Sequence, residues 1–358
     1  MAARGVAATL PPRDEPAALR VVPVTDALRW DRFVRAAPDG TACHLWAWRE
    51  LMLGALGHET LSLAARDGDG EYRGVLPLVR VRSPLTGHFL VSMPFLNDGG
   101  PLGDDIARAH LARHALEEAR RSGARLVELR VRRPVAFPEA SAPPRKVTRL
   151  LPLPATAEEL WEKGFRAKLR SQVRRPMKEG MEFRAGPAEA DAFYRVFARN
   201  MRDLGTPVLP RCWFQGLARL LPENAVFGAV YRGDTPVAGA CGLAWGGELE
   251  MTWASALREH GAAAPNMLLY WGMMREAISR GLTVFNFGRC TPGGPTHRFK
   301  EQWGGADAVL PWISWSSKGE AGTPSPDSPA YRTAVAAWKR LPLGVANLLG
   351  PALARHFP

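Results

Sequence analysis

One order of predicted elements occurs twice in this chain of 358 residues. In each half, a run of three strands precedes a long helix, and an apolar strand follows that helix. The corresponding ranges are 61–93, 104–122 and 126–131 in the first half, and 225–257, 266–280 and 283–288 in the second. The two halves share negligible residue identity, so the repeat is one of pattern. It favours a chain of two similar domains over a single larger fold.

Glycine and proline mark where these elements end. Gly57, Gly123 and Gly281 each follow a predicted helix, and the proline-rich stretch 134–144 indicates a domain boundary. The sequence therefore predicts four segments. They are a disordered tail at 1–18, a first domain at 19–150, a second at 151–320, and a linker with an amphipathic segment at 321–358.

The charge balance limits the partners that the protein could have. Lys and Arg exceed Asp and Glu by 47 to 35, giving a net charge of +12. This excess favours nucleic acid, nucleotide phosphates or an anionic membrane surface as partners, without choosing among them. The four cysteines are scattered without metal-ligand spacing, so we expect no metal site and no disulfide framework. No apolar run reaches the ~18 residues of a membrane span, and we expect a cytoplasmic protein.

Three strands, a helix and a following parallel strand resemble the core of the GNAT acyltransferase fold. In that fold, backbone N–H groups at the helix N-terminus receive the pyrophosphate of an acyl carrier. The matching turn here is Leu257–Asn266, where Arg258, Gly261 and Ala263 fit the phosphate-loop pattern R/Q-x-x-G-x-G/A and Asn266 opens the helix. The resemblance implies a donor-binding loop there. A loop ended by an ordinary Pro-Asn helix start is the alternative.

Two motifs after this helix resemble the FemAB-related branch of the same superfamily. They are Phe285–Arg289 (FNFGR) and 296–304 (THRFKEQWG), and the tail Tyr331–Pro351 adds a third similarity. Over roughly residues 20–350 the chain is most similar to FemAB-like proteins of exosortase/PEP-CTERM and exopolysaccharide loci, with BioF2-like acetyltransferase domains. The resemblance implies an α/β fold of two tandem GNAT-like domains with mixed sheets.

The same resemblance implies an N-acyltransferase or aminoacyltransferase with no permanently bound cofactor. The co-substrate would be an acyl-CoA or an aminoacyl-tRNA, and the acceptor a small-molecule amine or an amine of a cell-envelope or exopolysaccharide precursor. In the related families, the lysine of the F-K-x-x-F/W-G helix lies near the reacting carbonyl and the phosphates. That lysine corresponds to Lys300, although Glu301 replaces a frequent second basic residue.

Aminolysis of an ester or thioester needs a deprotonated amine and a stabilised oxyanion. Lys300 is our candidate for the stabilising cation, and a helix lysine lying along Trp303 is the alternative. Arg289 follows an apolar strand, at the sheet end where ligands gather, so we expect it to bind an anion. A salt bridge to Glu301 or Asp307 would be the structural explanation for Arg289.

Three further polar residues are weaker candidates. His297 could serve as a general base, but exposed histidines at helix starts are common. Asn286 could orient a substrate amide or make a structural hydrogen bond, and Asp98 could hold the acceptor amine or form an Asx turn. Cys290 is more often a buried structural residue than a nucleophile.

Two segments could contact anionic surfaces. The run 163–178 contains seven cations and no acid among them, and 163, 166, 170 and 174 would line one face of a single helix. It could bind tRNA phosphates or simply be a solvated face, and nothing in it predicts sequence-specific DNA binding. The segment Tyr331–His356 mixes leucines with cations and could lie on an anionic inner-membrane surface or pack on the second domain.

A non-catalytic accessory protein is the competing hypothesis. In it, one or both folds have lost their chemistry, and the basic surfaces dock the chain on a synthase or a membrane. The absence of a clear general base in the sequence keeps this hypothesis open.

Overall fold

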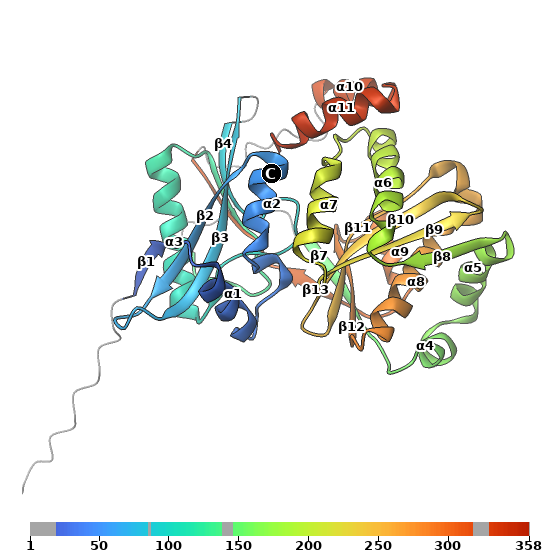
Figure 1. Ribbon diagram of the computed structural model, residues 1–358, viewed down its shortest axis with the longest axis horizontal. Coiled ribbons are helices and arrows are strands. Elements are labelled where there is room, and N and C mark those ends of the chain that lie inside the picture. Colours follow the sequence, from blue (N-terminus) through green and yellow to red (C-terminus); the bar gives the residue numbers. More distant parts are fainter. Residues whose placement is uncertain (1–18, 85–86, 138–145, 318–328, 358) are drawn as a thin grey trace, which may run out of the picture.

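The computed structural model describes residues 19–84, 87–137, 146–317 and 329–357. The predicted tail at 1–18 and most of the predicted linker lie outside the described residues, as does most of the proline-rich stretch 134–144. The described chain forms two seven-stranded mixed sheets with helices on both faces of each (Figure 1).

The first sheet is built almost entirely from the first half of the chain. Its strand order is β1-β2-β3-β4-β6-β14, and β5 pairs with β3. The bounds are β1 Arg20–Pro23, β2 Glu59–Arg66, β3 Tyr72–Ser83, β4 Gly87–Ser92, β5 Leu102–Gly103, β6 Leu126–Leu129 and β14 Ile313–Ser316. Helices α1 (Ala27–Ala36) and α2 (Ala47–Leu56) pack on one face, and α3 (Asp105–Ser122) packs on the other.

Caps fix the ends of these helices where the sequence predicts them. The side chain of Asp104 accepts a hydrogen bond from the backbone N–H of Ala107 at the start of α3. Gly57 and Gly123 end α2 and α3 in the left-handed conformation, with φ of 68° and 69°.

The second sheet has the order β13-β7-β12-β11-β10-β9-β8. The bounds are β7 Lys146–Pro152, β8 Met181–Ala185, β9 Ala225–Arg232, β10 Thr235–Trp245, β11 Glu248–Ala256, β12 Val284–Cys290 and β13 Ala306–Leu310. Helices α6 (Ala190–Leu204) and α7 (Arg211–Leu220) belong to the face nearer the first half. The opposite face carries α5 (Ala167–Lys178) and α8 (Pro265–Ser279).

Both sheets contain the parallel pair that the repeated pattern predicts. β4 pairs with β6 in parallel, and β11 pairs with β12 in parallel over Glu248–Glu250 and Val284–Asn286. A long helix connects the strands of each pair, α3 in the first sheet and α8 in the second. The predicted fold class of two tandem GNAT-like domains with mixed sheets is therefore confirmed.

Two strands show how the halves are joined. β7 pairs with β12 and β13, so the expected division between residues 150 and 151 falls inside a strand of the second sheet. The residue pattern at 309–315 predicts one strand, but the structure has two there, because the chain leaves the second sheet after β13 and pairs β14 with β6 of the first. Pro311 lies between them and has no N–H to donate to a ladder.

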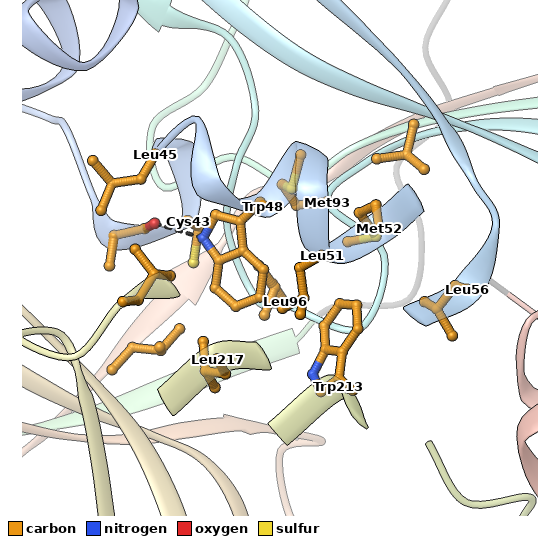
Figure 2. Close-up of a cluster of buried hydrophobic side chains, with 14 of the residues drawn as sticks. Cys43, Leu45, Trp48, Leu51, Met52, Leu56, Met93, Leu96, Trp213 and Leu217 are labelled. Atoms are coloured by element: carbon orange, nitrogen blue, oxygen red, sulfur yellow. Dashed lines mark hydrogen bonds between the residues drawn. The ribbon is translucent and has the colours of Figure 1, made fainter. Parts of the chain in front are cut away.

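A single buried cluster connects α1 and α2 of the first half with α6 and α7 of the second. Trp48 on α2 and Trp213 on α7 lie at its centre, with ring centroids 5.7 Å apart (Figure 2). Both indoles are fully buried, and Trp48 Nε1 donates to the carbonyl of Ala42 at 2.7 Å. The two halves therefore share a hydrophobic core of the kind found inside one domain.

Helix glycines in the two halves should respond oppositely to replacement by alanine. A Cβ on Gly272 of α8 would lie 2.3 Å from the ring of Phe183, which is also close to Gly228. We expect Gly272→Ala to lower the free energy of unfolding by about 1–3 kcal/mol through overpacking. The same change at Gly54 of α2, where a Cβ meets nothing within 4 Å, should raise it by roughly 0.5–1 kcal/mol.

Urea denaturation of both variants measures the difference directly. Stabilisation by Gly272→Ala would contradict the close approach of α8 to β8.

Thr156 and the apolar residues after it predict one helix to about Arg175, but this helix is interrupted. A short helix α4 (Ala157–Glu159) and a π-helical turn at Leu160–Gly164 precede α5, and Phe165 between them is extended. The predicted single basic face through 163, 166, 170 and 174 therefore does not form. Arg170 turns inward and donates to the carbonyl of Phe165 at 2.7 Å, while Arg174 lies over the ring of Trp161.

The sequence predicts that Pro342 and Pro351 both interrupt the C-terminal segment. This segment forms two helices, α10 (Pro329–Lys339) and α11 (Leu343–Ala354), which are separated at Pro342, whereas Pro351 lies inside α11. They lie beside α6, across the end of that helix (Figure 1). Within the part of the chain that the structure describes, no helix is both long and apolar enough to cross a bilayer.

Candidate functional site

Lys300 and Arg289 meet where β12 ends. Lys300 lies on the short helix α9 (Pro295–Glu301), is only 3% exposed, and donates to the backbone carbonyls of Gly288 at 2.6 Å and Arg289 at 3.1 Å. It does not lie exposed along Trp303 as the structural alternative supposed. Burial, with a smaller contribution from the neighbouring charge of Arg289, lowers the pKa of Lys300 to about 8, although Cys290 and Glu250 oppose the shift.

The bend that presents these carbonyls depends on a glycine and an asparagine. Gly288 has φ of 71°, and a Cβ there would lie 2.4 Å from the carbonyl oxygen of Met251. The Oδ1 of Asn286 accepts hydrogen bonds from the Thr148 hydroxyl and from the backbone N–H of Gly288, and its Nδ2 donates to Glu248 at 2.8 Å. Asn286 thus makes the structural hydrogen bonds that were the alternative to its predicted substrate contact.

Both ring nitrogens of His297 are occupied. Nδ1 accepts from the backbone N–H of Gly293 at 3.2 Å, so Nε2 carries the proton and donates to Asp307 at 2.7 Å. Arg149 pairs with the same carboxylate at 2.6 Å. The ring connects α9 to β13, and this geometry gives no support to its predicted role as a general base.

Trp312 and the loop after β4 bring the first half to this site. The guanidinium groups of Arg289 and Arg130 lie 4.6 Å and 4.7 Å from the ring centroid of Trp312, whose Nε1 donates to the carbonyl of Asn97. Desolvation, together with the charge of Arg130, lowers the pKa of Arg289 to about 10, so the guanidinium stays charged at neutral pH. Arg289 forms no salt bridge with Glu301 or Asp307, which was the structural alternative to anion binding.

Three carboxylates from both halves surround Arg132, which follows β6. Its guanidinium lies 3.0 Å from oxygens of Asp98, Glu248 and Glu250, and Asn97 donates to Glu250 at 2.7 Å. Glu250 is 4% exposed, and its burial raises its pKa despite the nearby arginine. Asp98, which was predicted to hold the amine substrate, also accepts a hydrogen bond from the backbone N–H of Gly99. Its side chain is therefore fixed at the junction between the sheets.

A groove of about 430 Å³ opens at the end of β12, beside Arg289 and Cys290. Lys146 and Arg289 supply its positive charges, and Thr291 and Thr296 supply hydroxyls. The ammonium of Lys146 donates to the Thr291 hydroxyl at 2.7 Å. Cys290 also lines the groove but is largely buried, and burial raises the pKa of its thiol, which opposes a role as nucleophile.

The predicted donor loop directly precedes α8. Residues Arg258–Ala263 form a short 3-10 helix of six residues, with Arg258 and Gly261 exposed, and Ala264 enters α8 with φ of 56°. A left-handed alanine is strained, and such strain gathers at functional sites. Gln302, directly after α9, contacts Met267 of α8, one residue after Asn266.

This contact places Lys300 and the donor loop on neighbouring elements. Glu259 within the loop forms an ion pair with Arg199 at 2.6 Å, which partly cancels the positive charge there. The exposed backbone around Gly261 has room for a phosphate, since a Cβ there would meet nothing within 4 Å.

The two halves are held together at this point by Arg132, Glu250 and Trp312, none of which the sequence motifs indicate. Charged residues at alternate positions of an otherwise apolar strand, as in Glu248 and Glu250 of β11, are the signal that could have identified the carboxylates. Among the described residues, no group of His, Cys, Asp and Glu side chains could hold a metal ion.

Residues 163–301 match the acetyltransferase (GNAT) domain. The matched range contains both the donor loop and Lys300, so the second half carries a GNAT acetyltransferase domain. No curated protein sequence matches the chain.

Solved structures share this GNAT-like fold over most of the chain. FemX is similar with a TM-score of 0.60 and 16% identity, over 83% of this chain and 97% of that one. The DUF2156 C-terminal domain of an Agrobacterium fabrum protein named for lysylphosphatidylglycerol synthetase gives 0.54 and 14%, over 82% and 92%. A Bacteroides thetaiotaomicron protein of unknown function gives 0.55 and 10%, over 84% and 100%. At these identities the likeness concerns the fold.

Proposed function

We propose that this protein transfers an acyl or aminoacyl group from an activated donor to an amine of a cell-envelope or exopolysaccharide precursor. The observation that carries the proposal is the GNAT match over 163–301, within which Lys300 lies on α9 and the loop Arg258–Ala263 directly precedes α8, the helix that packs against α9. Donor phosphates would bind at the loop, with Asn266 at the helix start. The reacting carbonyl would lie toward Arg289.

The reaction needs one new bond and one broken bond. The acceptor nitrogen attacks the donor carbonyl carbon, the C–N bond forms, and the C–S or C–O bond to the carrier breaks. The positive charges of Lys300 and Arg289 would stabilise the oxyanion that develops in between. The proton lost by the amine would pass to a carboxylate at the junction, for which Glu250 is suited because its pKa is raised.

The donor is an acyl-CoA or an aminoacyl-tRNA. The side chains of Arg166, Lys168 and Arg175, on and beside α5, are exposed and can contact phosphates, whereas Arg170 is turned inward. These exposed cations support a polyanionic donor. The similarity to exosortase/PEP-CTERM-associated FemAB-like proteins supports a precursor of the cell envelope as acceptor.

A donor screen with the full-length chain tests this proposal. We expect either a CoA thioester or a charged tRNA to raise the melting temperature, because a ligand at a hundredfold excess over its Kd stabilises the native state by about 2.7 kcal/mol. The same donor should yield an amide with an amine acceptor, detected by mass spectrometry. Uncharged tRNA and free CoA are the matched controls for binding without transfer. If no donor binds or reacts, the proposal is wrong.

One observation supports the alternative hypothesis of a non-catalytic accessory protein. The ring of His297 and two of the three donors of Lys300 are already used within the fold. A chain that binds a donor without releasing an amide under any acceptor condition would favour this hypothesis.

A further inference from the structure

Helix α11 packs against the protein in an unusual way, with its small residues inside and its large ones outside. Ala346, Gly350 and Ala354, spaced by four, are buried, and a Cβ on Gly350 would lie 2.9 Å from the side chain of Val208. Globular helices normally bury their leucines instead. The inner face of α11 therefore gains close contact with the protein but little hydrophobic burial.

The outer face of α11 is apolar. Leu348 is 77% exposed, Leu349 44% and Val345 40%, and their spacing places all three on one side of the helix. Phe357, just beyond the helix, is 40% exposed. The helix contains no charged residue along its length. Such an unpartnered stripe implies that something covers it.

The charge around this stripe indicates what covers it. The segment from 329 to 357 contains no Asp or Glu. Lys339 and Arg340 precede α11, Arg355 follows it, and all three side chains are exposed. A second copy of the chain would bring these cations against their own equivalents, which opposes a symmetric dimer through this face. An anionic surface with an apolar interior satisfies both the leucines and the cations.

We propose that α11 docks on an anionic lipid bilayer, with Leu348 and Leu349 inserted among the acyl chains and the flanking cations at the phosphate level. The helix has 12 residues, too few to span a bilayer, so it lies in the plane of the interface. This surface is distinct from the site at the end of β12, and the inference does not depend on the proposed function.

Vesicle co-sedimentation of the full chain tests the proposal. We expect binding to vesicles of phosphatidylcholine with phosphatidylglycerol, and much weaker binding to phosphatidylcholine alone. The double variant Leu348→Ser/Leu349→Ser should lose roughly tenfold or more in partition coefficient on the anionic vesicles. Leu28→Ser on α1, where the leucine is 81% exposed, is the matched control and should bind like the unchanged chain.

A second variant separates charge from insertion. Lys339→Gln/Arg340→Gln should lower the partition coefficient on anionic vesicles by about thirtyfold at low salt, with a smaller loss at high salt. All replaced side chains are exposed, so circular dichroism should show an unchanged fold. No binding by the unchanged chain, or equal binding by the leucine variant, would overturn the proposal. So would a dimer in analytical ultracentrifugation that the leucine variant dissociates.

Discussion

Replacing Lys300 with methionine should lower kcat/KM for acyl transfer by about 10²–10³, the usual effect of removing one donor from a preorganised site for an oxyanion. Methionine has a similar length and fills the buried space, so only the charge and the hydrogen bonds to Gly288 and Arg289 are lost. The measurement is a steady-state amide assay with the donor that the screen identifies. Retention of more than about a tenth of the activity, with an intact fold, would exclude Lys300 as the stabilising cation.

The pH profile distinguishes a charge role from a packing role for Lys300. Because burial lowers its pKa to about 8, the ammonium loses its proton as pH rises through that value. A reaction that needs the cation should therefore slow above about pH 8, while deprotonation of the acceptor amine speeds it at lower pH. Lys300→Arg keeps the charge over this whole range, and whatever activity it retains should lack the decline near pH 8.

Arg132→Met should lower the free energy of unfolding by about 2–3 kcal/mol. The change leaves Asp98 and Glu250 buried without their cation, and breaking a buried pair costs roughly 3–5 kcal/mol. The side chain of Arg132 is 36% exposed, so water compensates part of this cost. Urea unfolding measures the difference.

Arg133 is the matched control for Arg132. It is the next residue, is 51% exposed, and pairs with Asp39 and Asp105 at the surface, so Arg133→Met should cost less than about 1 kcal/mol. In the double variant Arg132→Met/Glu250→Gln, part of the lost stability should return because one uncompensated charge is gone. Equal effects of the two arginine changes would contradict a central role for Arg132 at the junction.

Local sequence signals predicted much of the fold. Alternating strands, Gly57 and Gly123 as helix ends, and Asp104 ahead of α3 give elements close to those observed, because caps and periodicity act over a few residues. The repeated order of elements then predicted the parallel pairs β4·β6 and β11·β12.

The predictions that the structure contradicts depend on interactions between residues distant in the chain. No local sequence pattern predicts that the stretch 309–315 divides between two sheets. Pro311 indicates only that a continuous strand would be interrupted there. The interruption at Phe165 and the inward turn of Arg170 depend on packing of that segment against α8 and α9. Tertiary packing overrode the helical pattern there.

The candidate site was only partly predictable for the same reason. Lys300 and Arg289 were identified from a motif, and the structure brings them together at the end of β12. Two of the carboxylates around Arg132, those of Glu248 and Glu250, lie more than a hundred residues from it in the sequence. Such pairings follow from topology, which a single sequence reveals only through its repeats.

The return of the chain through β14 affects how this protein can be divided. A fragment that stops before Ile313 would leave the edge of β6 without its neighbour, and an open edge strand invites pairing with other chains. A fragment limited to 163–301 would lack β7 and β13, and so the two strands beyond β12 at that edge of the second sheet. The two halves are therefore unsuited to exchange as independent modules, and cloning them separately should give material that aggregates.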